Sequence, residues 1–429
     1  MRRVVANARS TVSQTLASSL AIHSVNVAIS ITVARGLGPA DRGLLAAVLL
    51  WPALVSTVGA LGLADAVTVF IASRSRPIGR TVGAALIIVL LQSAVITAIA
   101  AGVNVAVFSS HGDDVLRQAL LFTGYIPFSM LTIFVSAYLQ GRAAFVHYQL
   151  LRFAYVAIAL VAIILATIGK LDLRESLIAF FGAHVGAAAI AALIFRNFDG
   201  LSGVEIRLSD VRDLAATGAK SHVVNVAALV NERLDQVVIS LVLAPVHLGI
   251  YAVAVTLMSL TILVGASVST VAFPRAASAA RDERLHLCRR YVRVLLGLTI
   301  GVSIPVITCT PYIIQALFGS EFADAVAPAR ILVAAAVALA LARLLGALLK
   351  ASGLPLSPAR GELVGLIVGA VLLLTLLPVV GVIAAAVASL AAYTVTALWL
   401  LRRLGSVLHV KPRSLIWRER SRAQLAEPA

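Results

Sequence analysis

Long apolar stretches follow one another along almost the whole sequence, separated by short breaks that contain charged residues, glycine or proline. Most stretches reach the roughly 20 residues that a helix needs to cross a bilayer, and they lack the strict polar–apolar alternation of a transmembrane β-strand. The second stretch is long enough to tilt or break, and we expect a kink at Pro52 or Gly62. The pattern predicts twelve spans, at residues 14–34, 44–72, 82–108, 118–140, 153–169, 176–195, 219–243, 249–273, 291–317, 329–350, 362–378 and 381–401.

The composition agrees with a polytopic membrane protein. Of the 429 residues, 60% are hydrophobic and 13% are charged, whereas soluble domains are about 45–50% apolar and about one quarter charged. This balance argues against a water-soluble enzyme, and we expect no nucleic-acid partner despite the net charge of +16. The two cysteines, Cys288 and Cys309, have no ligand spacing around them, so we expect neither a disulfide nor a metal site.

The basic residues predict the orientation of the spans. In the twelve-span layout, 27 of the 35 lysine and arginine residues fall at the two termini or in loops on the same side as the termini. Cytoplasmic loops carry the excess of positive charge in membrane proteins, so we predict that both termini are cytoplasmic. The first stretch runs to about Ala34 without a plausible cleavage site, and we expect a retained span, not a removed signal peptide.

Six predicted spans precede the longest connection and six follow it. We therefore predict an all-α fold in which two six-helix bundles surround a central cleft. Within the connection, Ser209 and Asp210 could cap a short helix that lies along the inner interface. The predicted N-terminal bundle, linker, C-terminal bundle and basic cytoplasmic tail are residues 1–200, 201–218, 219–403 and 404–429.

The two halves share a short motif. Residues 37–43 and 243–249 place leucine, proline and glycine in the same register, 206 positions apart. Proline ends a helix and glycine permits a turn, which gives both residues a mechanical reason to recur. Chance similarity between apolar stretches is the alternative. Because both halves begin on the cytoplasmic side, the repeat is parallel, as in transporters built from two bundles around a cleft.

Polar residues gather in the seventh predicted span, where ionisable groups are costly and normally face a cavity or a partner. Asn225, Glu232 and Asp235 fall along one helical stripe, and Glu232 lies near the middle of the membrane. The repeat places Asn26 of the first span at an equivalent depth, with His23 three residues away on the same face.

Two interpretations of these polar groups stay open. They could line a hydrated cleft that binds a polar headgroup, with Glu232 and Asp235 as candidates for ion coupling. Alternatively, Glu232, Arg233 and Asp235 form a neutralised cluster that fixes helix packing. Arg343 in the tenth span could meet a diphosphate or pair with one of these acids.

Motifs of enzyme active sites are missing from the sequence: it contains no nucleophile elbow, His-Glu-x-x-His, P-loop or Asp-rich diphosphate–metal motif. We therefore expect neither an enzyme nor a cofactor. The absence of a P-loop also excludes a self-contained ATP-driven pump, but it does not exclude a separate ATPase that associates with this chain.

Four segments resemble a known family. Residues 33–43 resemble the span one–two signature of bacterial oligosaccharide-lipid flippases, the polysaccharide-type members of the multidrug/oligosaccharidyl-lipid/polysaccharide exporter superfamily. Residues 231–236 and 249–254 look like the span seven–eight region of that family, and residues 317–322 are similar to its loop after span nine. The segments occur in the family's order and the resemblance extends over most of the chain.

The resemblance implies a V-shaped pair of bundles in the bacterial cytoplasmic membrane. It implies transport of an undecaprenyl-diphosphate-linked glycan from the inner to the outer leaflet, with H⁺ or Na⁺ as a possible coupling ion and glycosyltransferases and a polymerase of the same pathway as possible partners. It also makes Arg35, Arg233 and Arg343 candidate contacts for a diphosphate or a sugar acid, although Arg35 could be an ordinary interfacial residue. The sequence departs from the family at Ala244 and Leu248, which soften the second-half turn.

Two other functions compete with the flippase. A cation-coupled small-molecule or multidrug antiporter could use the same fold. A membrane-embedded polymerase or glycosyltransferase would be expected to carry a substantial outer loop, and the outer loops predicted here are short.

Overall fold

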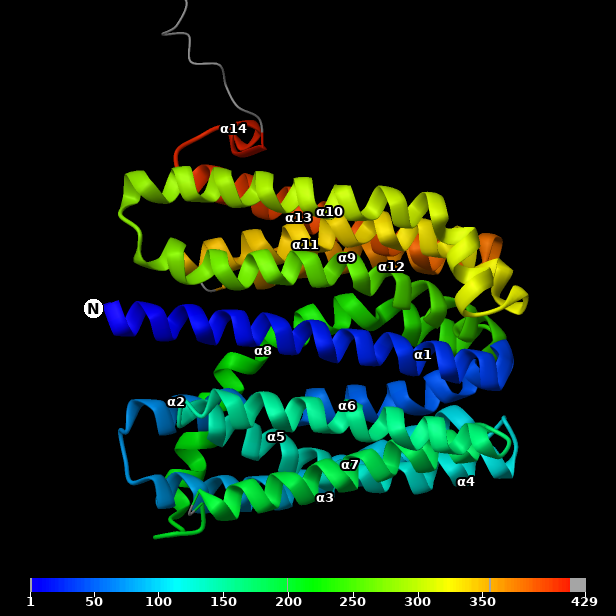
Figure 1. Cartoon of the computed structure of the whole chain (residues 1–429), viewed down its shortest axis with the longest axis horizontal. Coiled ribbons are helices and arrows are strands. Elements are labelled where there is room, and N and C mark those ends of the chain that lie inside the picture. The colour runs from blue at the N-terminus through cyan, green and yellow to red at the C-terminus, as the bar shows by residue number, and fades with distance from the viewer. Residues whose placement is uncertain (1, 199, 355, 417–429) are drawn as a thin grey trace, which may run out of the picture. The chain divides into compact units, whose positions relative to one another are not determined.

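The computed structural model describes residues 2–198, 200–354 and 356–416, without the side chains of residues 2–16, 220, 221, 223–225, 281 and 282. Every regular element in these ranges is a helix (Figure 1), which confirms the all-α prediction. The 3-10 helices are η1 (Thr123–Tyr125) and η2 (Ser320–Ala325). The α-helices are α1 (Arg2–Gly59), α2 (Leu63–Ser73), α3 (Ile78–Phe108), α4 (Asp113–Phe122), α5 (Ile126–Gly141), α6 (Phe145–Ile168), α7 (Leu173–Asn197), α8 (Leu208–Val242), α9 (Pro245–Ser278), α10 (Arg281–Leu317), α11 (Val326–Ala351), α12 (Ser357–Val380), α13 (Val382–Val407) and α14 (Pro412–Ile416).

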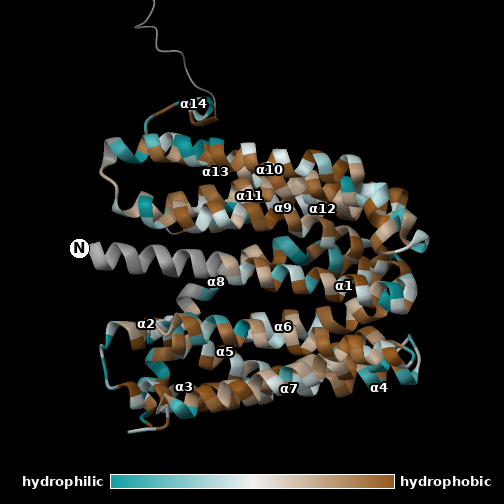
Figure 2. Ribbon diagram, in the orientation of Figure 1, coloured by the Kyte–Doolittle hydropathy of each residue, from teal (hydrophilic) through white to brown (hydrophobic). Residues whose placement is uncertain are grey.

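Ten helical stretches among the described residues are long and apolar enough to cross a membrane. Figure 2 shows their hydrophobic middle parts, with hydrophilic residues gathered at many of the helix ends and in the loops. The ten differ from the predicted twelve at two places, α1 and α8. A polytopic membrane protein is therefore confirmed, whereas the number twelve stays a prediction.

Helix α1 contains the first two predicted spans. Its apolar part, Ala17–Gly59, has 43 residues, a length of about 65 Å at 1.5 Å per residue, which is twice the thickness of the hydrocarbon core. The helix breaks at Gly38, whose φ of 70° is accessible to glycine at little cost. The expected break near Gly62 is also present: Leu61 and Gly62 have positive φ, and α2 begins at Leu63. Pro52 stays inside the helix.

Helix α8 departs from the sequence expectation. The predicted short helix at Ser209 and Asp210 and the predicted seventh span form one continuous helix, Leu208–Val242. Its N-cap is Arg207, and no side chain that the structure describes caps it. This helix is not among the ten candidate spans. Its apolar part contains three charged residues, Glu232, Arg233 and Asp235, whereas the apolar 18-residue core of a candidate span contains at most two.

The chain divides into two compact units. The first comprises residues 1–256 and 312–326, and the second comprises residues 257–311 and 327–429. The boundaries between the two units fall within α9, α10 and α11. The sequence analysis predicted the boundary between its two bundles in the connection before the seventh span. Two six-helix bundles stay a proposal.

In the second unit, α12 packs closely on α13 through glycines at four-residue spacing. A Cβ at Gly365 would overlap the Thr396 hydroxyl, and one at Gly369 would lie 2.9 Å from the Ala392 Cβ. Small residues of this spacing let the backbones of membrane helices approach each other. The start of the predicted tail belongs to this unit as well, since Leu415 of α14 is fully buried in its core.

An ion-pair cluster in the first unit fixes the start of α8 to α3. Arg80 binds the Asp210 carboxylate with two hydrogen bonds of 2.7 and 2.8 Å, and Arg76 adds a third of 2.7 Å. Arg76 also reaches the exposed Asp213. The Asp210 side chain is almost completely buried. The hydrogen bonds from Arg80, with the charges of both arginines, hold the pKa of the Asp210 carboxyl below its ordinary value.

We expect Asp210→Asn to lower the midpoint of thermal unfolding, because it leaves the two guanidinium groups without their anion. The difference from the wild type should be complete above about pH 4, the ordinary pKa of an aspartate, and should disappear as the pH falls through the lowered folded-state pKa. Asp213→Asn is the matched control and should cost less, since Asp213 is exposed and accepts one hydrogen bond. Equal unfolding midpoints for the two variants would contradict this role of Asp210.

Candidate functional site

The two copies of the repeated motif contact each other. A Cβ at Gly43 of α1 would overlap the carbonyl oxygen of Pro245, and a Cβ at Gly249 of α9 would overlap the carbonyl oxygen of Pro39. The contact is reciprocal and uses equivalent residues of the two copies. The sequence predicted that this glycine permits a turn, but both glycines lie inside helices and permit a close backbone approach instead. This contact brings α1 and α9 together beside a cavity.

The cavity has a volume of about 390 Å³ and lies entirely within the first unit, among α1, α8 and α9. Its wall on α1 is one helical stripe of Arg42, Ala46, Leu49, Ala53 and Thr57, with Leu50 and Leu54 beside it. Residues of α8 and α9 complete the wall: Leu229, Arg233, Gln236, Ala252, Val255 and Thr256. The small side chains Ala46 and Ala53 leave space between the larger ones.

Arg42 is the central polar residue of this cavity. Its Nη2 donates a long hydrogen bond of 3.4 Å to the Ser30 hydroxyl, which lies 2.8 Å from the Thr256 hydroxyl. Its Nε is buried and has no hydrogen-bond partner in the part of the chain that the structure describes. A buried guanidinium N–H without an acceptor is costly. Arg42 therefore offers an unused donor to a ligand that carries acceptor oxygens.

Arg233 supplies a second positive charge to the cavity. It is exposed, and its Nη1 donates to Gln236 Oε1 over 3.1 Å. None of the described residues that line the cavity is acidic. Two guanidinium groups without a carboxylate in the wall favour an anion, and their planar donor arrays fit phosphate or carboxylate oxygens.

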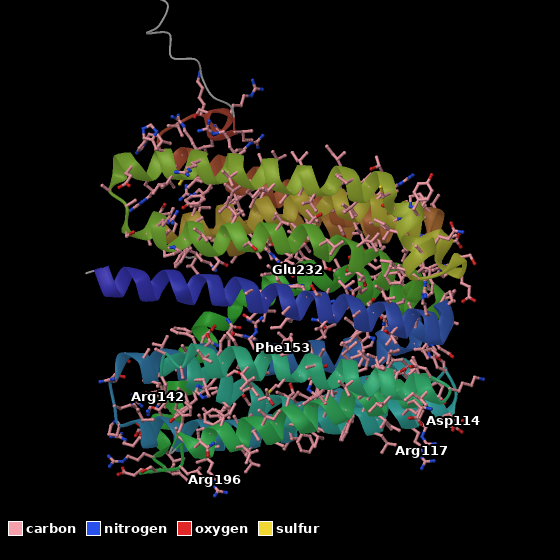
Figure 3. The ribbon with its side chains drawn as sticks, viewed as in Figure 1. Asp114, Arg117, Arg142, Phe153, Arg196 and Glu232 are labelled. Atoms are coloured by element: carbon pink, nitrogen blue, oxygen red, sulfur yellow. The ribbon has the colours of Figure 1, made fainter. Side chains whose placement is uncertain are left out.

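The two carboxylates of α8 have different environments. Asp235 is buried, and its carboxylate accepts a hydrogen bond from the buried Tyr251 hydroxyl. Glu232 is half-buried; it is labelled on α8 in Figure 3. Neither lines the cavity around Arg42.

The other polar candidates from α1 and α8 do not line this cavity. Asn26 is exposed and its amide donates to the Ile22 carbonyl of its own helix, at 3.0 Å. His23 is half-buried on the same helix. The side chain of Asn225 lies outside the described residues.

The remaining arginine candidates lie elsewhere. Arg35 donates from Nε to the Leu317 carbonyl at 2.8 Å and from Nη2 to the Ala316 carbonyl, so it caps the C-terminal end of α10. Cations are favourable at that end of a helix, where carbonyl groups lack partners. Arg343 is half-buried in α11, in the second unit.

The sequence interpretation missed Arg42. It placed Arg42 in an outer loop, because the residue follows a Gly-Pro break. A signal was present, since Arg42 continues the stripe of Ala46, Leu49 and Ala53 with helical spacing. What could not be read was that α8 and α9 pack around this stripe.

The sequence matches the profile of a family described as polysaccharide biosynthesis protein over residues 10–280, which is more than half of the chain. None of the curated proteins compared with the chain matches it in sequence.

Several solved structures are similar in fold. One is an inward-facing multidrug resistance MATE family transporter of the MOP superfamily, with a TM-score of 0.73, 14% identity, and coverage of 91% of this chain and 98% of the other. Lipid II flippase MurJ in an inward closed conformation has a TM-score of 0.72 and 15% identity, over 91% of this chain and 88% of the other. The eukaryotic MATE transporter AtDTX14 has a TM-score of 0.66 and 15% identity, over 95% and 98%. These likenesses show a shared fold.

Proposed function

This chain belongs to the polysaccharide biosynthesis protein family, and on that basis we propose that it is a flippase for a lipid-linked glycan. The substrate would be an undecaprenyl-diphosphate-linked oligosaccharide, carried from the cytoplasmic to the outer leaflet. Membership of the family supports a glycan as part of the substrate. The fold shared with a lipid flippase and MATE transporters supports transport and not catalysis.

The observation that carries this proposal is the pair of arginines in the cavity among α1, α8 and α9. A diphosphate presents several acceptor oxygens with negative charge, which match the unused Nε of Arg42 and the exposed guanidinium of Arg233. A multidrug antiporter that carries organic cations would need the opposite charge in its cavity, and the described residues that line this one include no acidic side chain. Arg35 is engaged with α10 and has no part in this proposal; Arg343 stays a candidate contact in the second unit.

The location and partners of the protein follow from the same proposal. The chain would lie in the bacterial cytoplasmic membrane with both termini in the cytoplasm, as the distribution of basic residues predicts. Successive helices of the first unit are expected to cross from one side of the membrane to the other. In Figure 3, Asp114 and Arg117 lie at the opposite end of this unit from Arg142 and Arg196, which supports that expectation. Glycosyltransferases would supply the lipid-linked glycan, and a polymerase would use it on the other side.

If transport is coupled to protons, Asp235 is the better placed carrier of the two carboxylates, because it is buried and bound to Tyr251. Protonation of a buried carboxylate removes a charge that is costly inside the membrane. We expect Asp235→Asn to abolish the dependence of transport on a proton gradient across proteoliposomes. Glu232→Gln is the control and should keep it; the reverse pattern would assign the coupling to Glu232.

The leaflet distribution of undecaprenyl-linked glycan in cells depleted of this protein tests the function directly. We expect the complete lipid-linked unit to accumulate on the cytoplasmic face, where an externally added, membrane-impermeant glycan probe cannot reach it. Re-expression of the wild-type protein should restore outward exposure. Normal exposure in depleted cells, combined with increased drug susceptibility, would support the antiporter instead.

A further inference from the structure

A second cavity of about 380 Å³ lies in the first unit, next to the arginine cavity. It is lined by aromatic and small polar side chains of α1, α4, η1, α5, α6 and α7, among them Tyr125, Tyr155 and His184. Phe122, Phe180 and the hydroxyl residues Ser56, Thr57 and Ser129 contribute to the wall. The cavity has the size and the mixed lining of a small-molecule site.

Three rings pack against one another in this wall. The His184 ring lies between those of Tyr125 and Tyr155, with centroid distances of 4.3 and 4.5 Å and interplanar angles of 33° and 41°. Each ring carries a polar group that can donate or accept a hydrogen bond. The wall therefore combines aromatic surface with hydrogen-bonding groups.

Ser56 adds a polar group to this wall. Its hydroxyl is buried and lies beside the hydroxyl of Tyr125. Each of these hydroxyls can both donate and accept hydrogen bonds, so the pair can also bind a hydroxyl group of a ligand.

The two cavities adjoin each other along α1. Leu49, Ala53 and Thr57 line both of them. Together they extend from Arg42 to Ala60, which is about 27 Å along a helix of 1.5 Å rise per residue. The second cavity begins at Leu49, seven residues or about 10 Å along α1 from Arg42. A diphosphate held between Arg42 and this end of the cavity can thus place the group attached to it beside the rings.

We propose that the cavity of Tyr125, Tyr155 and His184 binds the pyranose ring attached directly to the diphosphate, and so determines which first sugar is accepted. A pyranose has an apolar C–H face that packs on an aromatic ring and hydroxyl groups that need partners at its edge. Aromatic rings by themselves attract organic cations. Arg42 and Arg233 in the adjoining cavity oppose one, and none of the described residues that line the two cavities is acidic. This inference rests on the proposed flippase function and names the part of the substrate that the second cavity recognises.

Binding to the full-length protein in lipid nanodiscs tests the proposal. The probes are undecaprenyl diphosphate and its derivatives with one N-acetylglucosamine, glucose or galactose, with binding followed by native mass spectrometry. We expect the wild type to bind at least one sugar derivative more tightly than undecaprenyl diphosphate. Tyr155→Leu should weaken that derivative about threefold to tenfold, the range of an aromatic contact, and leave undecaprenyl diphosphate unchanged.

Three variants make the result specific. Tyr148→Leu is the matched control, because Tyr148 lies two turns away on the same face of α6 and lines neither cavity. Tyr155→Phe keeps the ring and should retain most of the preference, which guards against a packing defect in Tyr155→Leu. Arg42→Gln should weaken all probes, including undecaprenyl diphosphate.

The outcomes separate the two proposals. If Arg42→Gln weakens every probe but Tyr155→Leu does not reduce sugar preference, or no sugar derivative binds better than undecaprenyl diphosphate, the sugar site is wrong and the phosphate site stands. If no probe binds the wild type, the flippase proposal itself fails. Tight, Tyr155-dependent binding of tetraphenylphosphonium would overturn the sugar site in favour of an organic cation.

Discussion

Gly249→Ala should strongly destabilise the protein, although it adds one methyl group. The new Cβ would overlap the Pro39 carbonyl oxygen and lie 3.0 Å from the Gly43 nitrogen. Both are backbone atoms, so no flexible side chain can yield. Overpacking of this kind typically costs about 1–3 kcal/mol, and a rigid backbone contact places it at the upper end. Gly43→Ala should act similarly, because its Cβ would overlap the Pro245 carbonyl.

Gly102→Ala supplies the control for this substitution. Gly102 lies inside α3, and no atom of the described residues lies within 4 Å of the position of its Cβ. Alanine there should be neutral or stabilising by up to about 1 kcal/mol, the usual gain over glycine in a helix. The measurement is the thermal unfolding midpoint of the purified protein in detergent. A Gly249→Ala protein as stable as Gly102→Ala would show that α1 and α9 do not depend on this contact.

The glycines of α1 show what the sequence could and could not predict. The membrane itself makes the spans predictable, because a helix that crosses it must be apolar over a fixed length. The breaks at Gly38 and Gly62 are predictable for a local reason, the conformational freedom of glycine. The reason for Gly43 is not local: the motif was recognised in both halves, but only the contact with α9 explains why glycine recurs.

The candidate site was less predictable for the same reason. Arg35 and Arg42 lie seven residues apart on either side of the Gly38 break, and nothing in the sequence separates their roles. Arg35 caps a helix end 282 positions away along the chain, whereas Arg42 faces a cavity. Charge patterning indicated that arginines matter near the first break, but long-range packing decides which of them is available to a ligand.

Arg42→Gln should reduce transport of lipid-linked glycan about tenfold to a hundredfold while the protein stays folded. Hydrogen bonds to a charged group contribute about 1.5–3 kcal/mol, and glutamine removes the charge and the fork that could hold a phosphate. Its native contact is weak, since the bond to Ser30 is 3.4 Å long, so little stability should be lost. The measurement is the rate at which lipid-linked glycan becomes accessible on the opposite side of proteoliposomes.

Two further variants decide whether the charge or the packing of Arg42 matters. Arg117→Gln is the matched control: Arg117 is exposed in α4, lines none of the cavities around α1, and should transport at the wild-type rate. Arg42→Lys keeps the charge but not the planar donors, so it should recover part of the rate. A folded Arg42→Gln protein with wild-type transport would remove Arg42 from the substrate site. If Arg42→Gln does not fold and Arg42→Lys transports normally, the residue contributes a buried charge to packing, and the anion site must be sought around Arg233.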